Sequence, residues 1–149
     1  MSRSEPLTDG DRWNWLISLR DEAVKQLETS DGVILTCSAL KRRYRDVLRV
    51  ANYGHPNYHL HFIYLRGDPE TIRRRVAVRQ GHFLDHDGLV ASQFDHLEEP
   101  ESPTEWDALA VDVLREPDVV QRDVLELVKR VLHDDQEEKE RKLEEDEGE

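Results

Sequence analysis

Three polar side chains that could hold a small anion follow directly on an apolar run, Val33–Cys37. They are Ser38, Lys41 and Arg45, and the two cations lie four residues apart, on one face of a helix that would begin there. If the run is a buried strand, these groups lie at its carboxyl end, where parallel α/β sheets gather their catalytic residues. Two cations and a hydroxyl there suit a small anion. The alternative is that the basic side chains of residues 41 to 45 only form a solvated helix face.

A second group of cations lies in an arginine-rich segment, just before a stretch rich in Gly, Asp and His, Gly81–Gly88. Arg75 and Arg79 share a helix face there, where the lid of a kinase would place cations on transferring phosphoryl oxygens. Ordinary solvation of a surface helix would also explain these arginines. On its own, His82 would be an ordinary loop histidine.

Short apolar strands that alternate with amphipathic helices must position these side chains. This alternation predicts an α/β fold in which helices flank a parallel sheet. The expected strands are Val33–Cys37, His61–Leu65 and Ala108–Val113, and the expected helices are Asp11–Leu27, Arg42–Ala51, Pro69–Gly81 capped by Asp68, Leu89–Leu97 and Val119–Leu132. Apolar positions expected in the core include Trp15, Leu16, Leu40 and Leu48.

Charge and composition bound the partners of the chain. The 149 residues carry a net charge of −12, which disfavours nucleic acid and anionic lipid as partners. Residues 134–149 hold ten Asp or Glu against three Lys or Arg, so they contribute −7 of this charge; we expect an acidic tail that is a frayed helix or disordered. The single cysteine, Cys37, fits a reducing cytosol, and no apolar run reaches the roughly 20 residues of a membrane span. We therefore expect a cytoplasmic protein with no membrane partner.

Four blocks of sequence, in one order, carry a resemblance to a known enzyme family. They read P-L-x-D-x-D-R-x-x-W-L from Pro6, C-S-A-L-K-x-x-Y-R-D-x-L-R from Cys37, F-I-Y-L-x-G-D from Phe62, and R-x-G-H-F-x5-L-x-x-S-Q-F-x-x-L-E-x-P from Arg79. This order strongly resembles the gluconokinase family of P-loop sugar-acid kinases, over residues 5 to 132.

The resemblance implies a fold similar to that of nucleoside monophosphate kinases. It also implies a reaction, the transfer of the ATP γ-phosphate to the 6-hydroxyl of D-gluconate with Mg²⁺, and delivery of 6-phosphogluconate to the pentose phosphate pathway. A small molecule, D-gluconate, is then the partner, and the oligomeric state is left open, a homodimer included. By position, the resemblance assigns sugar-acid binding to Asp11, Arg12, Ser38, Lys41 and Arg45, phosphate stabilisation to Arg75 and Arg79, and substrate binding to the motif positions His82 and Gln93.

The donor half of such a kinase has no counterpart in the 149 residues. The family begins with a strand, the P-loop G-x-x-x-x-G-K-[ST], a helix and a second strand, whereas no glycine here precedes Lys-Ser or Lys-Thr. We therefore expect a partial kinase domain over residues 1–133 that lacks the first strand, the P-loop and the first helix, and no ATP-dependent turnover by this chain alone. Met1 falls at a methionine of the family's motif, which is compatible with a truncated gene model, an alternative product or a true loss.

Three hypotheses of function remain from the sequence. The first is a gluconokinase whose donor half is supplied elsewhere or was lost. The second is a non-catalytic gluconate-binding or regulatory remnant of such a kinase. The third is an interaction module whose acidic tail recruits a basic partner.

Overall fold

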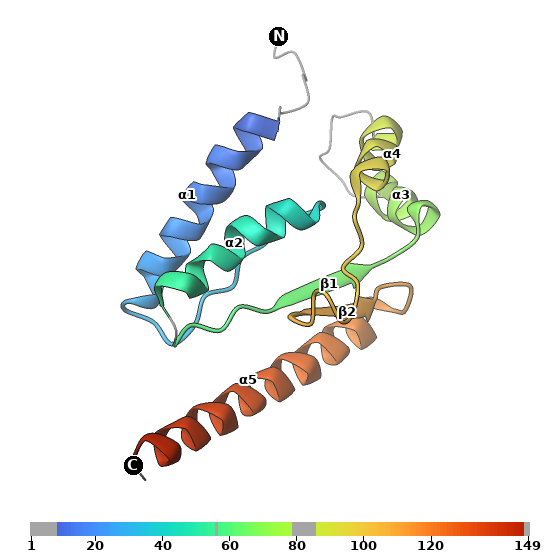
Figure 1. Ribbon diagram of the computed structural model, residues 1–149. Helices are drawn as coiled ribbons and strands as arrows, with labels where there is room; N and C mark the ends of the chain where they lie inside the picture. Colours follow the sequence, from blue (N-terminus) through green and yellow to red (C-terminus); the bar gives the residue numbers. More distant parts are fainter. Residues whose placement is uncertain (1–8, 56, 79–85, 148–149) are drawn as a thin grey trace. The chain divides into compact units, whose positions relative to one another are not determined.

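The computed structural model describes residues 9–55, 57–78 and 86–147 (Figure 1). The chain divides into two compact units. One unit holds residues 1–60 and 92–100, and the other holds residues 61–91 and 101–149.

Two helices make the first unit, α1 (Asp9–Leu27) and α2 (Arg42–Gly54), and they pack against each other. On α2 the buried residues Tyr44, Val47 and Leu48 recur at helical spacing, so a single apolar face turns inward. Leu16 of α1 is only 2% exposed. Both helices confirm the sequence-based prediction, and the burial of Leu16 and Leu48 confirms their place in the core.

Two expectations for the first unit are wrong. Trp15 is 51% exposed, so it does not belong to the core, whereas the expectation for the half-buried Leu40 stays a prediction. The run Val33–Cys37 is extended but forms no strand, because no other part of the described chain hydrogen-bonds to its backbone. Its side chains still alternate between half-buried and exposed, and Ile34 is 94% exposed.

A two-stranded parallel sheet is the centre of the second unit. Strand β1 (Phe62–Arg66) pairs with β2 (Ala108–Asp112) in a register that runs from Phe62 opposite Ala108 to Arg66 opposite Asp112. Val111 of β2 and Val113 beyond it are buried. The fold class is therefore α/β with a parallel sheet and helices, as predicted.

Helix α3 (Pro69–Val78) begins directly after β1, through two residues with distinct roles. Gly67 lies so close to its neighbours that an added Cβ would be 2.8 Å from Val113 Cγ2. Asp68 caps the helix, since its Oδ1 accepts the Thr71 N–H at 2.8 Å and its Oδ2 accepts the Thr71 hydroxyl at 2.9 Å. Helix α4 (His86–His96) follows later in the chain. The predicted cap and the predicted proline at the first helical position are both found.

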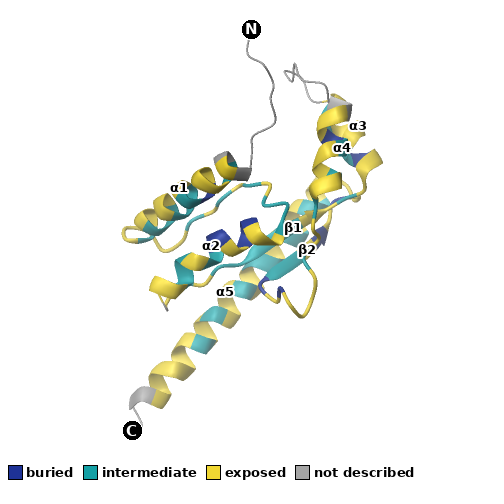
Figure 2. Cartoon of the chain, turned by 45° about the horizontal axis from the view of Figure 1, so that its top comes forward, coloured by how far each residue is buried: buried dark blue, intermediate teal, exposed yellow. Residues whose placement is uncertain are grey.

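Helix α5 (Pro117–Glu147) is much longer than predicted, with 31 residues. It contacts β2, and its half-buried residues Val120, Val124, Leu127 and Val131 form one stripe. The helix passes residue 133 without a break, and Asp135 lies 3.0 Å from Nε2 of His61. Towards its C-terminus the helix is largely exposed (Figure 2). The division of the chain at residue 133 stays a prediction.

Across the described ranges, no helix combines the length and the apolar composition that crossing a bilayer requires.

Candidate functional site

The turn between the extended run and α2 carries two of the predicted site residues, Ser38 and Lys41. Within it, Ala39 has a φ of +37°, a left-handed conformation that residues other than glycine rarely adopt. Lys41 is extended, with φ −97° and ψ 146°, and its side chain makes no capping hydrogen bond to α2. The turn therefore needs support from outside itself.

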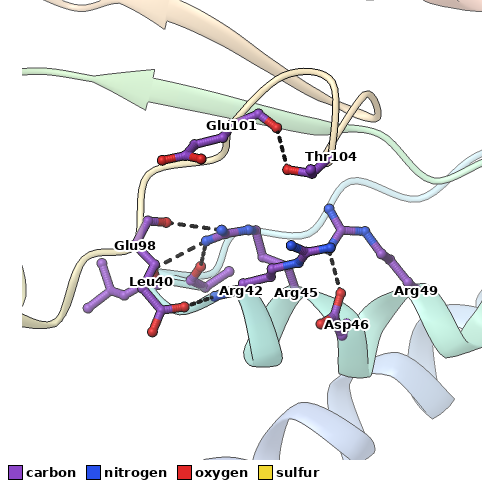
Figure 3. A network of polar contacts seen from close by, with 9 residues as sticks. Leu40, Arg42, Arg45, Asp46, Arg49, Glu98, Glu101 and Thr104 are labelled. Carbon is purple, nitrogen blue, oxygen red and sulfur yellow. Dashed lines mark hydrogen bonds and ion pairs between the residues drawn. The ribbon is translucent and has the colours of Figure 1, made fainter.

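Arg45 supplies part of that support from the first turn of α2. Its side chain is buried, with the residue only 3% exposed. Nη1 donates to the carbonyl oxygens of Ala39 at 2.9 Å and Leu40 at 3.2 Å, and Nη2 donates to the carbonyl oxygen of Glu98 at 3.0 Å (Figure 3). A buried cation is stable only when such acceptors satisfy it. The solvated-face alternative is thus wrong for Arg45, although Arg42 and Arg43 are exposed as it requires.

Glu98 completes the support, because it bonds the turn through three different groups. Its N–H donates to the Leu40 carbonyl at 2.8 Å, its carbonyl accepts from Arg45, and its carboxylate Oε2 accepts the Arg42 N–H at 2.7 Å (Figure 3). Arg42 is the first residue of α2, whose leading N–H groups lack partners within the helix and favour a negative charge. Sequence reasoning assigned no role to Glu98. One feature of the sequence could have pointed to such a residue. The cap position of α2 is Lys41 and not Ser, Thr, Asp or Asn, so the helix needs a capping group from elsewhere.

The other two predicted site residues of the turn are Ser38 and Lys41. Ser38 is exposed, and Lys41 is half-buried with its Nζ 5.6 Å from the centre of the Tyr44 ring. That distance is within the range of a cation–π contact, which restricts the position of the ammonium group. The turn thus presents one hydroxyl and one cation.

Cys37 precedes the turn and adds no charge to it. Burial raises the pKa of the Cys37 thiol, and a hydrogen bond from the Ala39 backbone N–H offsets only part of this effect. The thiol therefore stays protonated at neutral pH. A neutral thiol is a poor nucleophile, so we assign no covalent role to Cys37.

Three further residues predicted to bind substrate lie in the same unit as the turn. Arg12 is half-buried near the start of α1, and Gln93 is exposed on α4. Asp11 falls within α1, but its side chain lies outside the described part of the structure. Their assignment to substrate binding stays a prediction.

The predicted phosphate-stabilising residues belong to the second unit. Arg75 is exposed on α3, and its Nη2 donates to the carbonyl oxygen of Arg115 at 3.1 Å. Arg79 and His82 lie outside the described residues. The proposed lid therefore also stays a prediction.

One exposed group on α5 has the composition of a metal site. Ligand atoms of His133, Asp134 and Glu137 lie within 4.8 Å of one another. All three side chains are exposed on one helix face, and such groups are common without an ion. A tightly bound cation needs more ligands than this helix face offers.

Comparison with known proteins identifies the family. No family model matches the chain. A thermoresistant gluconokinase of Escherichia coli K12 is 42% identical over 130 residues, which are 87% of this chain and 70% of that protein. A probable gluconokinase of Schizosaccharomyces pombe is 37% identical over 136 residues, 90% of this chain and 69% of the relative. This chain belongs to the gluconokinase family.

A solved structure agrees with this assignment to the gluconokinase family. The crystal structure of an unliganded sugar kinase from Janibacter sp. HTCC2649 matches with a TM-score of 0.71 and 38% identity, over 87% of this chain and 70% of that one. The names of these relatives are those of kinases, so the family is enzymatic. The family resemblance predicted from the four motif blocks is confirmed.

Proposed function

We propose that this chain provides the sugar-acid side of a gluconokinase, which phosphorylates D-gluconate at its 6-hydroxyl at the expense of ATP. The product, 6-phospho-D-gluconate, would feed the pentose phosphate pathway. The observation that carries the proposal is the turn of Ser38 and Lys41 at the start of α2, held in place by a buried arginine, in a chain of the gluconokinase family.

The proposed roles follow from the chemistry of the substrate. Gluconate is a fixed monoanion at neutral pH, so a charge-assisted hydrogen bond from the Lys41 ammonium group would orient its carboxylate. The Ser38 hydroxyl can donate or accept, which suits a neighbouring sugar hydroxyl. Arg45 would act indirectly, by holding the turn in place, because its guanidinium group donates hydrogen bonds to carbonyl groups of the turn.

The residues present do not fit ATP and Mg²⁺. The 149 residues contain no G-x-x-x-x-G-K-[ST] sequence, so the backbone N–H cradle, its lysine and the hydroxyl that holds Mg²⁺ have no counterpart. Arg75 and Arg79 alone would stabilise phosphate charge from a lid. The part that this chain plays is therefore to bind and orient the sugar acid. We also propose a cytoplasmic location, on the basis of its single cysteine.

A second candidate function is that of a non-catalytic gluconate-binding or regulatory protein. The lack of a G-x-x-x-x-G-K-[ST] sequence in the 149 residues favours it. A chain that keeps the sugar-acid turn but carries no phosphate cradle could still bind gluconate. Both candidates predict binding, and only the kinase predicts turnover once a donor half is supplied.

Calorimetric titration of the 149-residue chain with D-gluconate tests the proposal. We expect saturable binding, and Lys41→Ala should weaken it about tenfold or more because a charge-assisted hydrogen bond is lost. Arg42→Ala is the matched control, since it removes an equal charge from an exposed neighbour, and it should change the dissociation constant less than twofold. An absence of binding by the unmodified chain would contradict the proposed function. Equal affinities for all three proteins would mean that Lys41 is only part of a solvated helix face and does not bind gluconate.

A further inference from the structure

We propose that Arg45 and Glu98 are positioning residues, which together set the conformation of the turn Ser38–Lys41, and that Arg45 does not itself bind the carboxylate of the sugar acid. This inference rests on the proposed function, because it assigns different roles to residues of the same site. Arg45, which the family resemblance assigns to sugar-acid binding, receives a structural role instead.

The directions of the Arg45 hydrogen bonds support this division. Recognition of a carboxylate by arginine uses the two terminal nitrogens as a fork. Here Nη1 already donates to the carbonyls of Ala39 and Leu40, and Nη2 already donates to the carbonyl of Glu98. The residue is also only 3% exposed, so little of its guanidinium group is open to a ligand.

The backbone of the turn shows what the network maintains. Ala39 has a φ of +37°, and such a conformation persists in a residue other than glycine only when its surroundings determine it. The carbonyl groups of Ala39 and Leu40 both turn towards one guanidinium group. The buried cation therefore holds the peptide groups on either side of Leu40 and, through them, the direction in which Ser38 and Lys41 leave the turn.

Glu98 fixes the other side of the same turn, from a segment that is distant along the chain. Its carboxylate accepts the N–H of Arg42, 56 residues away, and so defines where α2 begins. Its main-chain N–H and carbonyl bond Leu40 and Arg45. Replacing the side chain removes the first contact and leaves the other two, so the contribution of the carboxylate can be measured separately.

Amide hydrogen exchange, followed by NMR on the full 149-residue chain, tests the positioning role without a ligand. Glu98→Ala should speed exchange of the Arg42 amide about tenfold, because that N–H loses its acceptor. Glu98→Gln keeps an oxygen acceptor and should restore most of the protection. The matched control is Glu99→Ala, which removes the same charge from an exposed neighbour and should leave the exchange unchanged. Unchanged exchange in Glu98→Ala would overturn the role of the carboxylate.

A comparison of two ligands tests whether Arg45 touches the substrate. D-gluconamide is the neutral amide of the same sugar acid, so the ratio of its dissociation constant to that of gluconate reports contact with the carboxylate. Arg45→Lys keeps a charge but cannot reach all three carbonyls. We expect Arg45→Lys to weaken the binding of both ligands by a similar factor, so that the ratio of the two dissociation constants changes less than twofold. Lys41→Ala should instead bring this ratio close to one.

The outcomes separate this inference from the proposed function. If Arg45→Lys lowers the ratio as far as Lys41→Ala does, Arg45 binds the carboxylate and the inference is wrong. If the unmodified chain binds neither ligand, the proposed function fails, and the exchange data still decide whether the Glu98 carboxylate holds the start of α2.

Discussion

A guanidinium group can organise main chain because it offers several donors in one plane. Arg45 uses this property for three carbonyl groups, while Lys41, one helical turn earlier, keeps its ammonium group beside the ring of Tyr44. Two cations of equal charge, four residues apart, thus have different environments. At the scale of the residue, burial and hydrogen-bond direction distinguish the two cations.

The contact around Gly67 gives a prediction about stability. In Gly67→Ala the new Cβ would lie 2.8 Å from Val113 Cγ2 and 3.1 Å from Ile72 Cδ1, and Val113 is buried. We expect the free energy of unfolding to fall by about 1–3 kcal/mol, because overpacking forces neighbouring side chains to shift. Urea denaturation measures this change. Gly54→Ala is the control, since nothing lies within 4 Å of its Cβ position, and an equal loss in both variants would contradict the steric explanation.

At the scale of the element, the helices begin with different caps. Helix α3 uses a local cap, Asp68, whereas α2 uses a carboxylate from a distant segment. A local cap depends only on neighbours in sequence, so it forms wherever the helix forms. A distant cap depends on the fold of the whole unit.

The cap of α3 predicts a pH dependence of stability. The Thr71 backbone N–H, and then the Thr71 hydroxyl, lower the pKa of the Asp68 carboxyl below its ordinary value. A carboxyl whose pKa is lower in the folded state stabilises the protein above its unfolded pKa, and this contribution is lost as the pH falls through the folded value. Melting temperatures measured between pH 7 and pH 2 should therefore fall less steeply for Asp68→Asn than for the unmodified chain. Parallel curves would show that the carboxylate charge contributes nothing.

The length of α5 predicts how far the chain can be shortened. A stop after Glu138 removes only residues of the largely exposed end, whereas a stop after His133 also removes Asp135 and its contact with His61. We expect the first truncation to leave the melting temperature unchanged and the second to lower it by about 2–8 °C, the scale of a part-buried hydrogen bond worth about 1 kcal/mol. Asp135→Asn in the full chain should reproduce part of the second effect. If both truncations melt alike, the contact with His61 is not stabilising.

At the scale of the whole molecule, the chain covers about 70% of the two gluconokinases compared above. Within the described ranges its sheet has two strands, and a sheet of this size needs further strands or packed helices to be stable. The backbone of Val33–Cys37 is likewise extended without a partner among the described residues. Exposed strand edges invite pairing with other chains, so we expect the purified chain to associate at high concentration.

The absence of a phosphate cradle from the 149 residues predicts the outcome of a kinase assay. The chain alone should show no ATP-dependent formation of 6-phosphogluconate, because γ-phosphate alignment and charge neutralisation both need groups that it does not contain. A coupled assay measures this product. The comparison is a fusion of this chain to the Gly-rich N-terminal segment of a related gluconokinase, which should turn over. Clear turnover by the chain alone would refute the prediction.

The sequence by itself determined the positions of the helices, though not the length of α5, and it determined two strands, the cap of α3 and the family. These features depend on local patterns, such as apolar spacing along α2 or the Asp68–Pro69 pair, and on motif order. Such features can be predicted from the sequence, because the groups that interact to form them lie within one helix or strand.

Tertiary structure alone decided which polar groups are buried against carbonyl groups of the main chain. Spacing placed Lys41 and Arg45 on one helix face, but the carbonyls that bury Arg45 include one from Glu98, 53 residues away. Apolar composition likewise favoured a strand at Val33–Cys37, yet a strand exists only where another segment supplies its hydrogen bonds. Burial and hydrogen-bond partners are properties of segments distant in sequence, so no local pattern of residues could reveal them.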